Sequence, residues 1–485
     1  MGQAVIRRLM LAALVGAAGC HRGEPIDATI AIEHVTLIDG TDRGPRPDVT
    51  VVIRDDRVVA VGPSSELRLG QVENRVDGTG MFVVPGLWDM HVHLFNYNEH
   101  AFPLFLANGV TTIRDVGDDL KEIGWLRQEV RAGRLLGPDM LIAGPILDSP
   151  SVVKVFPNGR AAVPTPETAR AMVDSLAGLD IDLIKVHSMT PRASYFAILD
   201  EARKKGLSVV GHVPDSVTIQ EAIDSGQRTI EHDFGIAFAN SNRGPELRSR
   251  FLASLGDYVR TSGLQFRLGP AFQRRIDWHD SAMAAYDYPS AAAFARDAAT
   301  RPVWFDPTLV VFNTMLLANE PGAGALPELK FAPKAALAFF DGVPPKAHPT
   351  QADIDAGRAG WTAAKTIFRE LVRQKAKFVA GTDVPVMPLV PGFSLHRELA
   401  LLVEIGLTPL EAIQAATRNA AQSMKQSDTG TIEPGKVANL VLLRADPLAD
   451  IGNLKAVQTV VLRGRLLDRV LLDRMLRDAE GFAKL

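Results

Sequence analysis

Residues 83–94 read Val-Val-Pro-Gly-Leu-Trp-Asp-Met-His-Val-His-Leu, an apolar run that contains His91 and His93. Side chains alternate across a β-strand, so residues i and i+2 point to the same face and two imidazoles can reach one ion. On a helix the two rings would diverge. The pair by itself is a weak signal, because most histidines in such a pattern are incidental. Its meaning therefore depends on the rest of the chain.

Further polar residues lie at or near the ends of four short apolar runs downstream. These residues are Lys185 in 181–187, His212 in 208–212, His232 in 228–232 and Asp383 in 378–383. Such runs are typical of buried strands, where an unpaired lysine is costly. Polar residues at successive strand ends indicate an α/β barrel whose active site lies at the carboxyl ends of its strands.

Eight apolar runs alternate with helix-like stretches, in the order of a (β/α)8 TIM barrel. The expected strands are 87–93, 111–114, 139–143, 182–186, 208–212, 228–231, 303–307 and 377–381. The connections 233–301 and 308–376 exceed an ordinary crossover, and long insertions at this face usually cover the substrate. Their aromatic residues either line a lid over an apolar group or pack the insertion's own core; these are Phe234, Phe238, Trp278, Tyr286 and Tyr288.

The two ends of the chain carry short β-like runs. Segments 28–86 and 430–470 are expected to combine into one small β-sandwich domain beside a barrel domain at 87–429.

The first twenty residues resemble a signal peptide, because Arg7 and Arg8 precede a short apolar run and small residues that lead to Cys20. Cys20 is the only cysteine, which excludes intramolecular disulfides, and its setting resembles a bacterial lipobox. We expect export, either to the periplasm as a released protein or to the cell envelope through a lipidated Cys20. The net charge of −3 and the lack of a basic run argue against a nucleic-acid partner.

The motifs resemble those of the amidohydrolase superfamily, and within it the secreted branch similar to imidazolonepropionases and prolidase-like (Xaa-Pro) dipeptidases. The matching segments are PGLWDMHVH (85–93), DLIKVH (182–187), VVGHVP (209–214), TIEHDFG (229–235) and VAGTDVP (379–385). The resemblance extends from about residue 30 to residue 465.

This resemblance implies a binuclear site with two divalent metal ions, of which zinc is the first choice. His91, His93 and Asp383 would hold the first ion, His212 and His232 the second, and a carboxylated Lys185 would bridge them. A metal-bound hydroxide would attack the scissile carbonyl, and Asp383 would be the catalytic residue that passes its proton to the leaving amine.

Two more residues are candidates to contact substrate. His187 shares a strand face with Lys185, so it is expected to touch either substrate or the outer side of a metal ligand, unless it is a packed structural histidine. Arg114 could bind a substrate carboxylate or form an ion pair with Asp115 or another barrel carboxylate. His279 has no such context and is expected at the surface.

The leading functional hypothesis is hydrolysis of an amide in a dipeptide or N-acyl amino acid. The alternatives are an esterase, lactonase or phosphotriesterase that uses the same site, and a non-catalytic surface-binding lipoprotein. The complete ligand set argues against the last, because buried polar groups are costly to retain without a purpose. The sequence leaves the substrate and homo-oligomerisation open.

Overall fold

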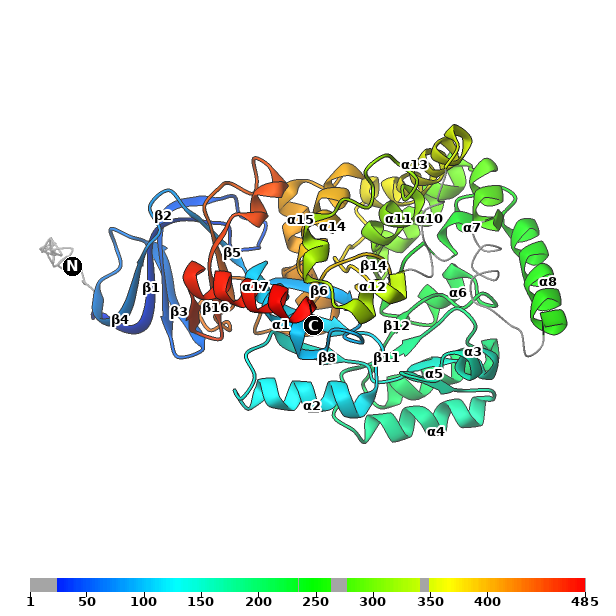
Figure 1. Ribbon diagram of the computed structural model, residues 1–485, viewed down its shortest axis with the longest axis horizontal. Helices are drawn as coiled ribbons and strands as arrows, with labels where there is room; N and C mark the ends of the chain where they lie inside the picture. The colour runs from blue at the N-terminus through cyan, green and yellow to red at the C-terminus, as the bar shows by residue number, and fades with distance from the viewer. Residues whose placement is uncertain (1–23, 234, 263–276, 341–348, 485) are drawn as a thin grey trace, which may run out of the picture.

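The computed structural model describes residues 24–233, 235–262, 277–340 and 349–484. It places a β-rich unit at one end of the molecule and a larger α/β body at the other (Figure 1). The predicted signal peptide and Cys20 lie outside the described residues, so export and lipid attachment stay predictions. None of the helices in these ranges is both long and apolar enough to cross a membrane.

The β-rich unit is one branched sheet built from both ends of the chain. Its strands are β1 (Ile26–Leu37), β2 (Arg46–Arg54), β3 (Arg57–Pro63), β4 (Leu69–Asp77), β5 (Phe82–Pro85), β15 (Leu440–Leu443), β16 (Val457–Leu462) and β17 (Arg465–Leu467). The order is β17-β16-β15-β5-β1-β2-β3, and β4 pairs with β1. Antiparallel pairing of β15 with β5 joins the two ends, as the sequence predicts. Alternate residues such as Val49, Val51 and Ile53 of β2 enter a core with Leu440 and Leu442 of β15.

The larger body contains two parallel sheets. The first has the order β6-β7-β8, and the second has the order β10-β9-β11-β12-β13-β14. Their bounds are β6 (Leu87–Val92), β7 (Val110–Asp115), β8 (Asp139–Ile142), β9 (Ile146–Asp148), β10 (Arg160–Ala162), β11 (Leu183–Val186), β12 (Ser208–Gly211), β13 (Thr229–Glu231) and β14 (Trp304–Asp306). Seven of the strands expected for a barrel are therefore present, parallel and in the expected chain order.

The eighth expected strand, 377–381, forms no ladder among the described residues, and the two sheets do not close into one continuous barrel ladder. Isolated parallel bridges pair Phe378 with Phe305 and Val384 with Val92. The Asp182 N–H also donates to the Ile142 carbonyl at 2.9 Å, across the gap between β8 and β11. The segment still hydrogen-bonds to its neighbours on both sides, because the Val379 N–H donates to the Phe305 carbonyl at 2.9 Å and the Met90 N–H donates to the Ala380 carbonyl at 2.9 Å.

Both sheets nevertheless share one apolar core, which includes Met90, Leu141, Leu183, Val210, Trp304 and Val379. Lys185 follows Leu183 by two residues, and His212 follows Val210 by two, so each polar side chain lies on the same strand face as this core. The core thus positions the polar residues one layer closer to the carboxyl ends of the strands.

Helices cover the outside of these sheets. They are η1 (Asn98–Ala101), α1 (Phe102–Ala107), α2 (Leu120–Arg131), α3 (Pro150–Val155), α4 (Pro166–Ala177), α5 (Arg192–Lys204), α6 (Ile219–Asp224), α14 (Phe393–Glu404), α15 (Pro409–Ala415), α16 (Arg418–Ser423), η4 (Ile451–Lys455) and α17 (Arg469–Ala483). Capping boxes at Thr165, Thr218 and Thr408 begin α4, α6 and α15, because each threonine satisfies a backbone N–H that the helix leaves unpaired.

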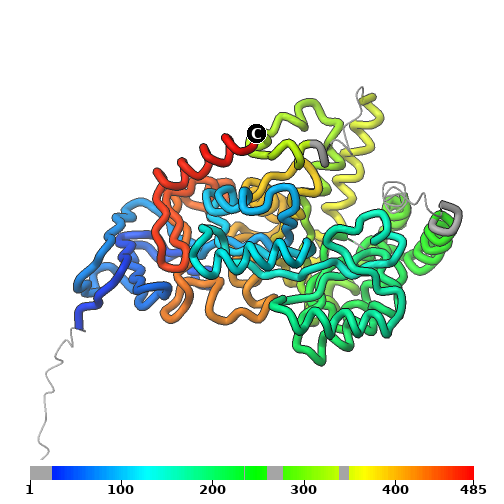
Figure 2. The backbone as a smooth tube through the Cα atoms, turned by 60° about the horizontal axis from the view of Figure 1, so that its bottom comes forward, coloured from blue at the N-terminus to red at the C-terminus, as the bar shows by residue number. Residues whose placement is uncertain are grey.

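The two long connections form a helical layer of their own. The first contributes α7 (Ile236–Ala239), α8 (Gly244–Ser262) and α10 (Tyr288–Thr300), and the second contributes α11 (Leu309–Leu316), η3 (Pro327–Phe331), α12 (Lys334–Phe340) and α13 (Gln351–Arg373). In both views α8 and α13 lie at the end of the molecule opposite β1–β4 (Figures 1 and 2).

Candidate metal centre

The six predicted ligands lie together at the carboxyl ends of the strands and are all buried. Their exposed fractions are 1% for His91, 7% for His93, 1% for Lys185, 8% for His212, 5% for His232 and 7% for Asp383. The His91 ring lies 5.0 Å from the His232 ring, which in turn lies 4.7 Å from the His212 ring, between centroids. Residues separated by nearly three hundred positions in the chain thus form one cluster.

His91, His93 and Asp383 converge on a single point. The Nε2 atoms of His91 and His93 lie 3.2 and 3.3 Å from Asp383 Oδ1, and the candidate ligand atoms of all three residues fall within 4.8 Å of one another. His232 Nε2 lies 3.8 Å from the other oxygen of Asp383. The carboxylate therefore faces three imidazoles: His91 lies on β6, and His93 and His232 directly follow β6 and β13.

The tautomers of two of these rings follow from their neighbours. His93 Nδ1 lies 2.8 Å from the Gly117 carbonyl, which can only accept a hydrogen bond. His232 Nδ1 lies 2.6 Å from Thr308 Oγ1, whose own hydrogen is donated to the Pro307 carbonyl at 2.8 Å. Each ring must therefore donate through Nδ1, so in its neutral form it turns the lone pair of Nε2 toward Asp383. Lone pairs that face a carboxylate at this distance need a cation between them, and this arrangement fits a bound metal ion.

The electrostatics of three of the four histidines agree with this donor set. Burial and the charge of Lys185 lower the pKa of His91 to about 3, and burial lowers the pKa values of His212 and His232. Burial acts to lower the pKa of His93, but the Asp383 carboxylate raises it more, so this ring needs the positive charge of an ion to stay neutral. Burial acts to raise the pKa of Asp383, but the imidazoles around it lower that pKa more, to well below its usual value. Neutral imidazoles beside an ionised carboxylate are the ligands that zinc and related divalent ions take in proteins.

His212 occupies the second half of the cluster. Its Nδ1 lies 2.7 Å from Ser188 Oγ, which fixes the orientation of the ring. His187 lies on the outer side of this ring, with the two ring centroids 4.1 Å apart, and His187 Nδ1 lies 2.9 Å from Asp148 Oδ2. Of the two contacts expected for His187, the structure therefore shows the one with a candidate metal ligand.

Lys185 reaches the cluster, but as one half of an ion pair. Its Nζ contacts Glu231 Oε2 and lies 3.4 Å from His91 Nε2. Glu231 is the last residue of β13 and directly precedes His232, and the sequence did not single it out. The signal was the same as for Lys185, since Glu231 is a charged residue in an otherwise apolar run that predicts a buried strand.

Of the two roles expected for Arg114, the structure shows the ion pair with carboxylates of neighbouring strands. Its side chain is fully buried, and Nη2 lies 2.8 Å from Glu231 Oε1 and 3.1 Å from Asp306 Oδ2, while Nη1 donates to Thr229 Oγ1 at 3.0 Å. The guanidinium is thus committed to barrel carboxylates, and they are not Asp115. A ligand cannot reach it without breaking this ion-pair network.

Arg160, which the sequence did not single out, is a better placed cation. Its Nη1 donates to Asp148 Oδ2 at 3.2 Å, next to His187, and its side chain keeps 15% exposure. Burial lowers the pKa of Arg160, whereas the carboxylates of Asp148 and Asp383 act to raise it. The Arg160 guanidinium therefore interacts electrostatically with the Asp383 carboxylate, and it shares its partner Asp148 with His187.

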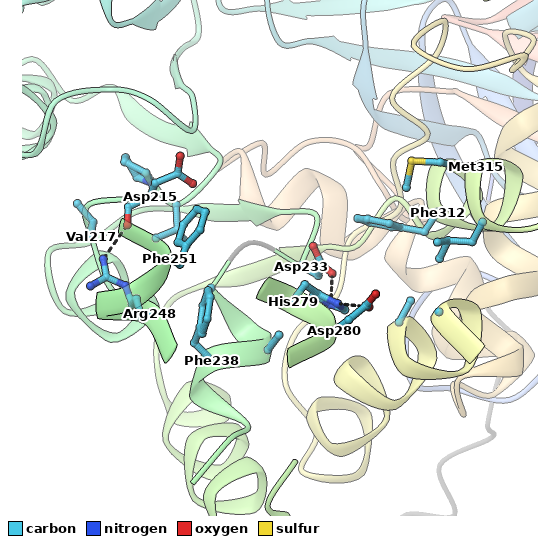
Figure 3. A pocket seen from close by; sticks show the side chains of 17 residues that line it. Asp215, Val217, Asp233, Phe238, Arg248, Phe251, His279, Asp280, Phe312 and Met315 are labelled. Atoms are coloured by element: carbon cyan, nitrogen blue, oxygen red, sulfur yellow. Dashed lines mark hydrogen bonds and ion pairs between the residues drawn. The ribbon is translucent and has the colours of Figure 1, made fainter. Parts of the chain in front are cut away.

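His279 is not the surface residue expected from the sequence. It lies in a cavity beside the cluster, where Nε2 is 2.8 Å from Asp233 Oδ2 and Nδ1 is 3.5 Å from Asp280 Oδ1 (Figure 3). Burial lowers the pKa of His279, but the two carboxylates raise it more, to about 10. The imidazolium thus joins the later part of the first long connection to its first residue, Asp233, which directly follows His232.

Comparison with known proteins assigns the family. The amidohydrolase family model matches residues 82–467. The chain is 26% identical to an imidazolonepropionase of Ralstonia nicotianae, over 85% of this chain and 90% of that protein. Among solved structures, bottromycin amidohydrolase gives a TM-score of 0.73 at 22% identity and covers 94% of this chain and 90% of its own. A putative prolidase from Bifidobacterium longum gives 0.64 at 25% identity and covers 94% and 100%.

The matched region contains all six predicted ligands, from His91 to Asp383. It also contains the strands that position them and both long connections. The chain belongs to the amidohydrolase family and is a hydrolase.

Proposed function

We propose that the protein is a binuclear metal-dependent amidohydrolase that hydrolyses the amide bond of a dipeptide or an N-acyl amino acid. The observation that carries the proposal is the set of imidazole Nε2 atoms directed at the ionised Asp383. The family and the names of its relatives, an imidazolonepropionase and a prolidase, support cleavage of a carbon–nitrogen bond.

In this proposal His91, His93 and Asp383 would hold one zinc ion, and His212 and His232 would hold the other. Lys185 would serve both ions as a carbamate, formed when its neutral amine adds carbon dioxide and releases a proton, and it would then give up its ion pair with Glu231. Its burial and its 3.4 Å distance from His91 Nε2 are compatible with that place. Bound metal would polarise the scissile carbonyl and lower the pKa of water toward neutrality.

The chain's own residues supply proton transfer and orientation. Asp383 is ionised and buried, so it can accept a proton from the attacking water and deliver it to the leaving amine. Arg160, whose Nη1 donates to Asp148, is the cation we assign to the carboxylate of the substrate. This pairing favours a peptide or acyl amino acid over a neutral lactone or phosphotriester.

The experiment is a substrate panel with the zinc-loaded protein: dipeptides, N-acyl amino acids, carboxylate esters, lactones and phosphotriesters. We expect amides with a free carboxylate to have the highest kcat/KM, and Arg160→Gln to raise KM for these but not for matched amides whose carboxylate is replaced by a methyl ketone. Faster turnover of lactones or phosphotriesters would show that the enzyme is a lactonase or phosphotriesterase and not an amidase. Tight substrate binding with no turnover would favour a binding protein.

A further inference from the structure

A cavity opens beside the metal centre, between the barrel and the two long connections. It contains about 870 Å³ of space free of protein atoms, part of which is open to solvent. Its wall comes from the loops after β12 and β13 and from helices α7, α8, α11 and α13, which are separated in the chain but meet here (Figures 1 and 3). Because part of this space is open solvent, the residues of the wall, rather than the volume, indicate which kind of group the cavity takes.

The wall of the cavity is mainly apolar. Phe238 of α7 and Phe251 of α8 lie on one side, and Phe312 and Met315 of α11 lie on the other (Figure 3). Val213 closes the wall near β12. Of the two roles that the sequence left open for the aromatic residues, Phe238 thus lines a cavity. Trp278 instead packs within the insertion, where its Nε1 donates to Ser254 Oγ at 3.1 Å.

The charged side chains of the wall already have partners. His279 is paired with Asp233 and Asp280, and Arg248 donates to the Asp215 carbonyl at 2.9 Å. A charged ligand group would have to compete with these contacts after losing its hydration. The cavity therefore suits an uncharged apolar group.

The cavity lies next to the candidate metal centre. Val213 and Asp233 directly follow His212 and His232, and the Phe312 ring lies edge-on to the His232 ring at 6.2 Å between centroids. A group in the cavity thus lies against residues that are the direct chain neighbours of the proposed ligands His212 and His232. A substrate can place its reacting amide at the centre and its apolar part in the cavity at the same time.

We propose that this cavity binds a bulky apolar group of the substrate, and that Phe238, Phe251, Phe312 and Met315 select for it. This inference rests on the proposed function and narrows its substrate class to amides that carry a large hydrocarbon or aromatic group. The cavity and the cation Arg160 then bind two different parts of one substrate, the apolar group and the carboxylate.

The test is a series of N-acyl amino acids with acyl groups from acetyl to naphthoyl, assayed with the zinc-loaded protein. Each buried methylene contributes about 0.8 kcal/mol, or roughly fourfold, so kcat/KM should rise with acyl size. Ala364 of α13 is 2% exposed and lines the cavity, so Ala364→Leu fills part of it. We expect this change to lower the ratio of kcat/KM for naphthoyl over acetyl substrates by about ten- to hundredfold.

Ala359→Leu is the matched control, because Ala359 lies on the same helix and is exposed. It should leave the ratio unchanged. Met315→Ala is a second variant that removes wall atoms instead of adding them, and it should also lower the ratio. Equal kcat/KM across the series in the wild type, or an unchanged ratio in both cavity variants, would overturn the proposal.

If no amide is hydrolysed, the proposed function fails but the cavity can still be examined. Calorimetry with N-naphthoyl glycine and the metal-loaded protein then measures binding alone. Binding that is lost in Ala364→Leu and kept in Ala359→Leu supports an apolar subsite at this centre. Absence of binding to the wild type overturns it.

Discussion

Asp383→Asn is expected to lower kcat/KM by about a hundred- to ten-thousandfold and to leave the fold intact. Asparagine can occupy the same space and coordinate through its oxygen, but its amide cannot take up a proton at neutral pH. The backbone should tolerate the change, because Asp383 has a φ of 58°, a left-handed conformation that asparagine adopts more readily than most residues. The measurement is kcat/KM on the best amide of the panel, with melting temperature and metal content recorded for each protein.

Asp118→Asn is the matched control. Asp118 lies near the same strand ends, where Oδ2 accepts the Leu94 N–H and Oδ1 accepts the Asp119 N–H, both at 3.0 Å, and an asparagine oxygen can keep one of these bonds. We expect near-normal turnover in this variant. Near-normal turnover in a folded, metal-loaded Asp383→Asn protein would show that the proton passes through another group.

Arg114→Leu is expected to destabilise the folded protein by about 3–5 kcal/mol, because it removes the guanidinium from a buried ion-pair network. Burial raises the pKa of Asp306 well above its usual value. Burial also acts to raise the pKa of Glu231, but Lys185, His91 and Arg114 lower it more, to about 2. Arg114 is thus one of the cations that keep a fully buried carboxylate ionised, and its removal leaves Glu231 and Asp306 without the guanidinium between them.

Chemical denaturation at fixed metal content measures this effect. Arg134→Leu is the control, since Arg134 pairs with Glu129 at 2.7 Å but its side chain is 64% exposed, and exposed pairs contribute little. A shift of the unfolding midpoint in Arg114→Leu no larger than in Arg134→Leu would mean that the barrel network does not depend on Arg114.

The strands and the ligand cluster could be predicted because both leave local patterns. His91 and His93 share a strand face, and Lys185, His212 and His232 each lie at or near the end of a short apolar run. The absence of a regular ladder in the eighth expected strand could not be predicted, because its isolated bridges are to Phe305 and Val92, which lie far away in the chain.

The same reason explains the residues that were missed or misassigned. Arg114 was given a possible substrate role because the sequence does not show that Glu231 and Asp306 face it from strands far along the chain. The pair of His279 with Asp233 joins the insertion to the barrel, and no periodicity reports such a contact. A strand pattern predicts the face on which a side chain lies. The residue that this side chain contacts depends on how distant segments of the chain pack together.

We propose that the cluster around Asp383 and Lys185 holds two metal ions that support amide hydrolysis. Titration of the metal-free protein with Zn²⁺, with amidase activity and bound metal measured together, tests it most directly. We expect activity to rise until two equivalents are bound, and Lys185→Ala to bind less than two and to lose activity. Full activity at one equivalent in the wild type, or amide turnover that does not depend on added metal, would contradict the account.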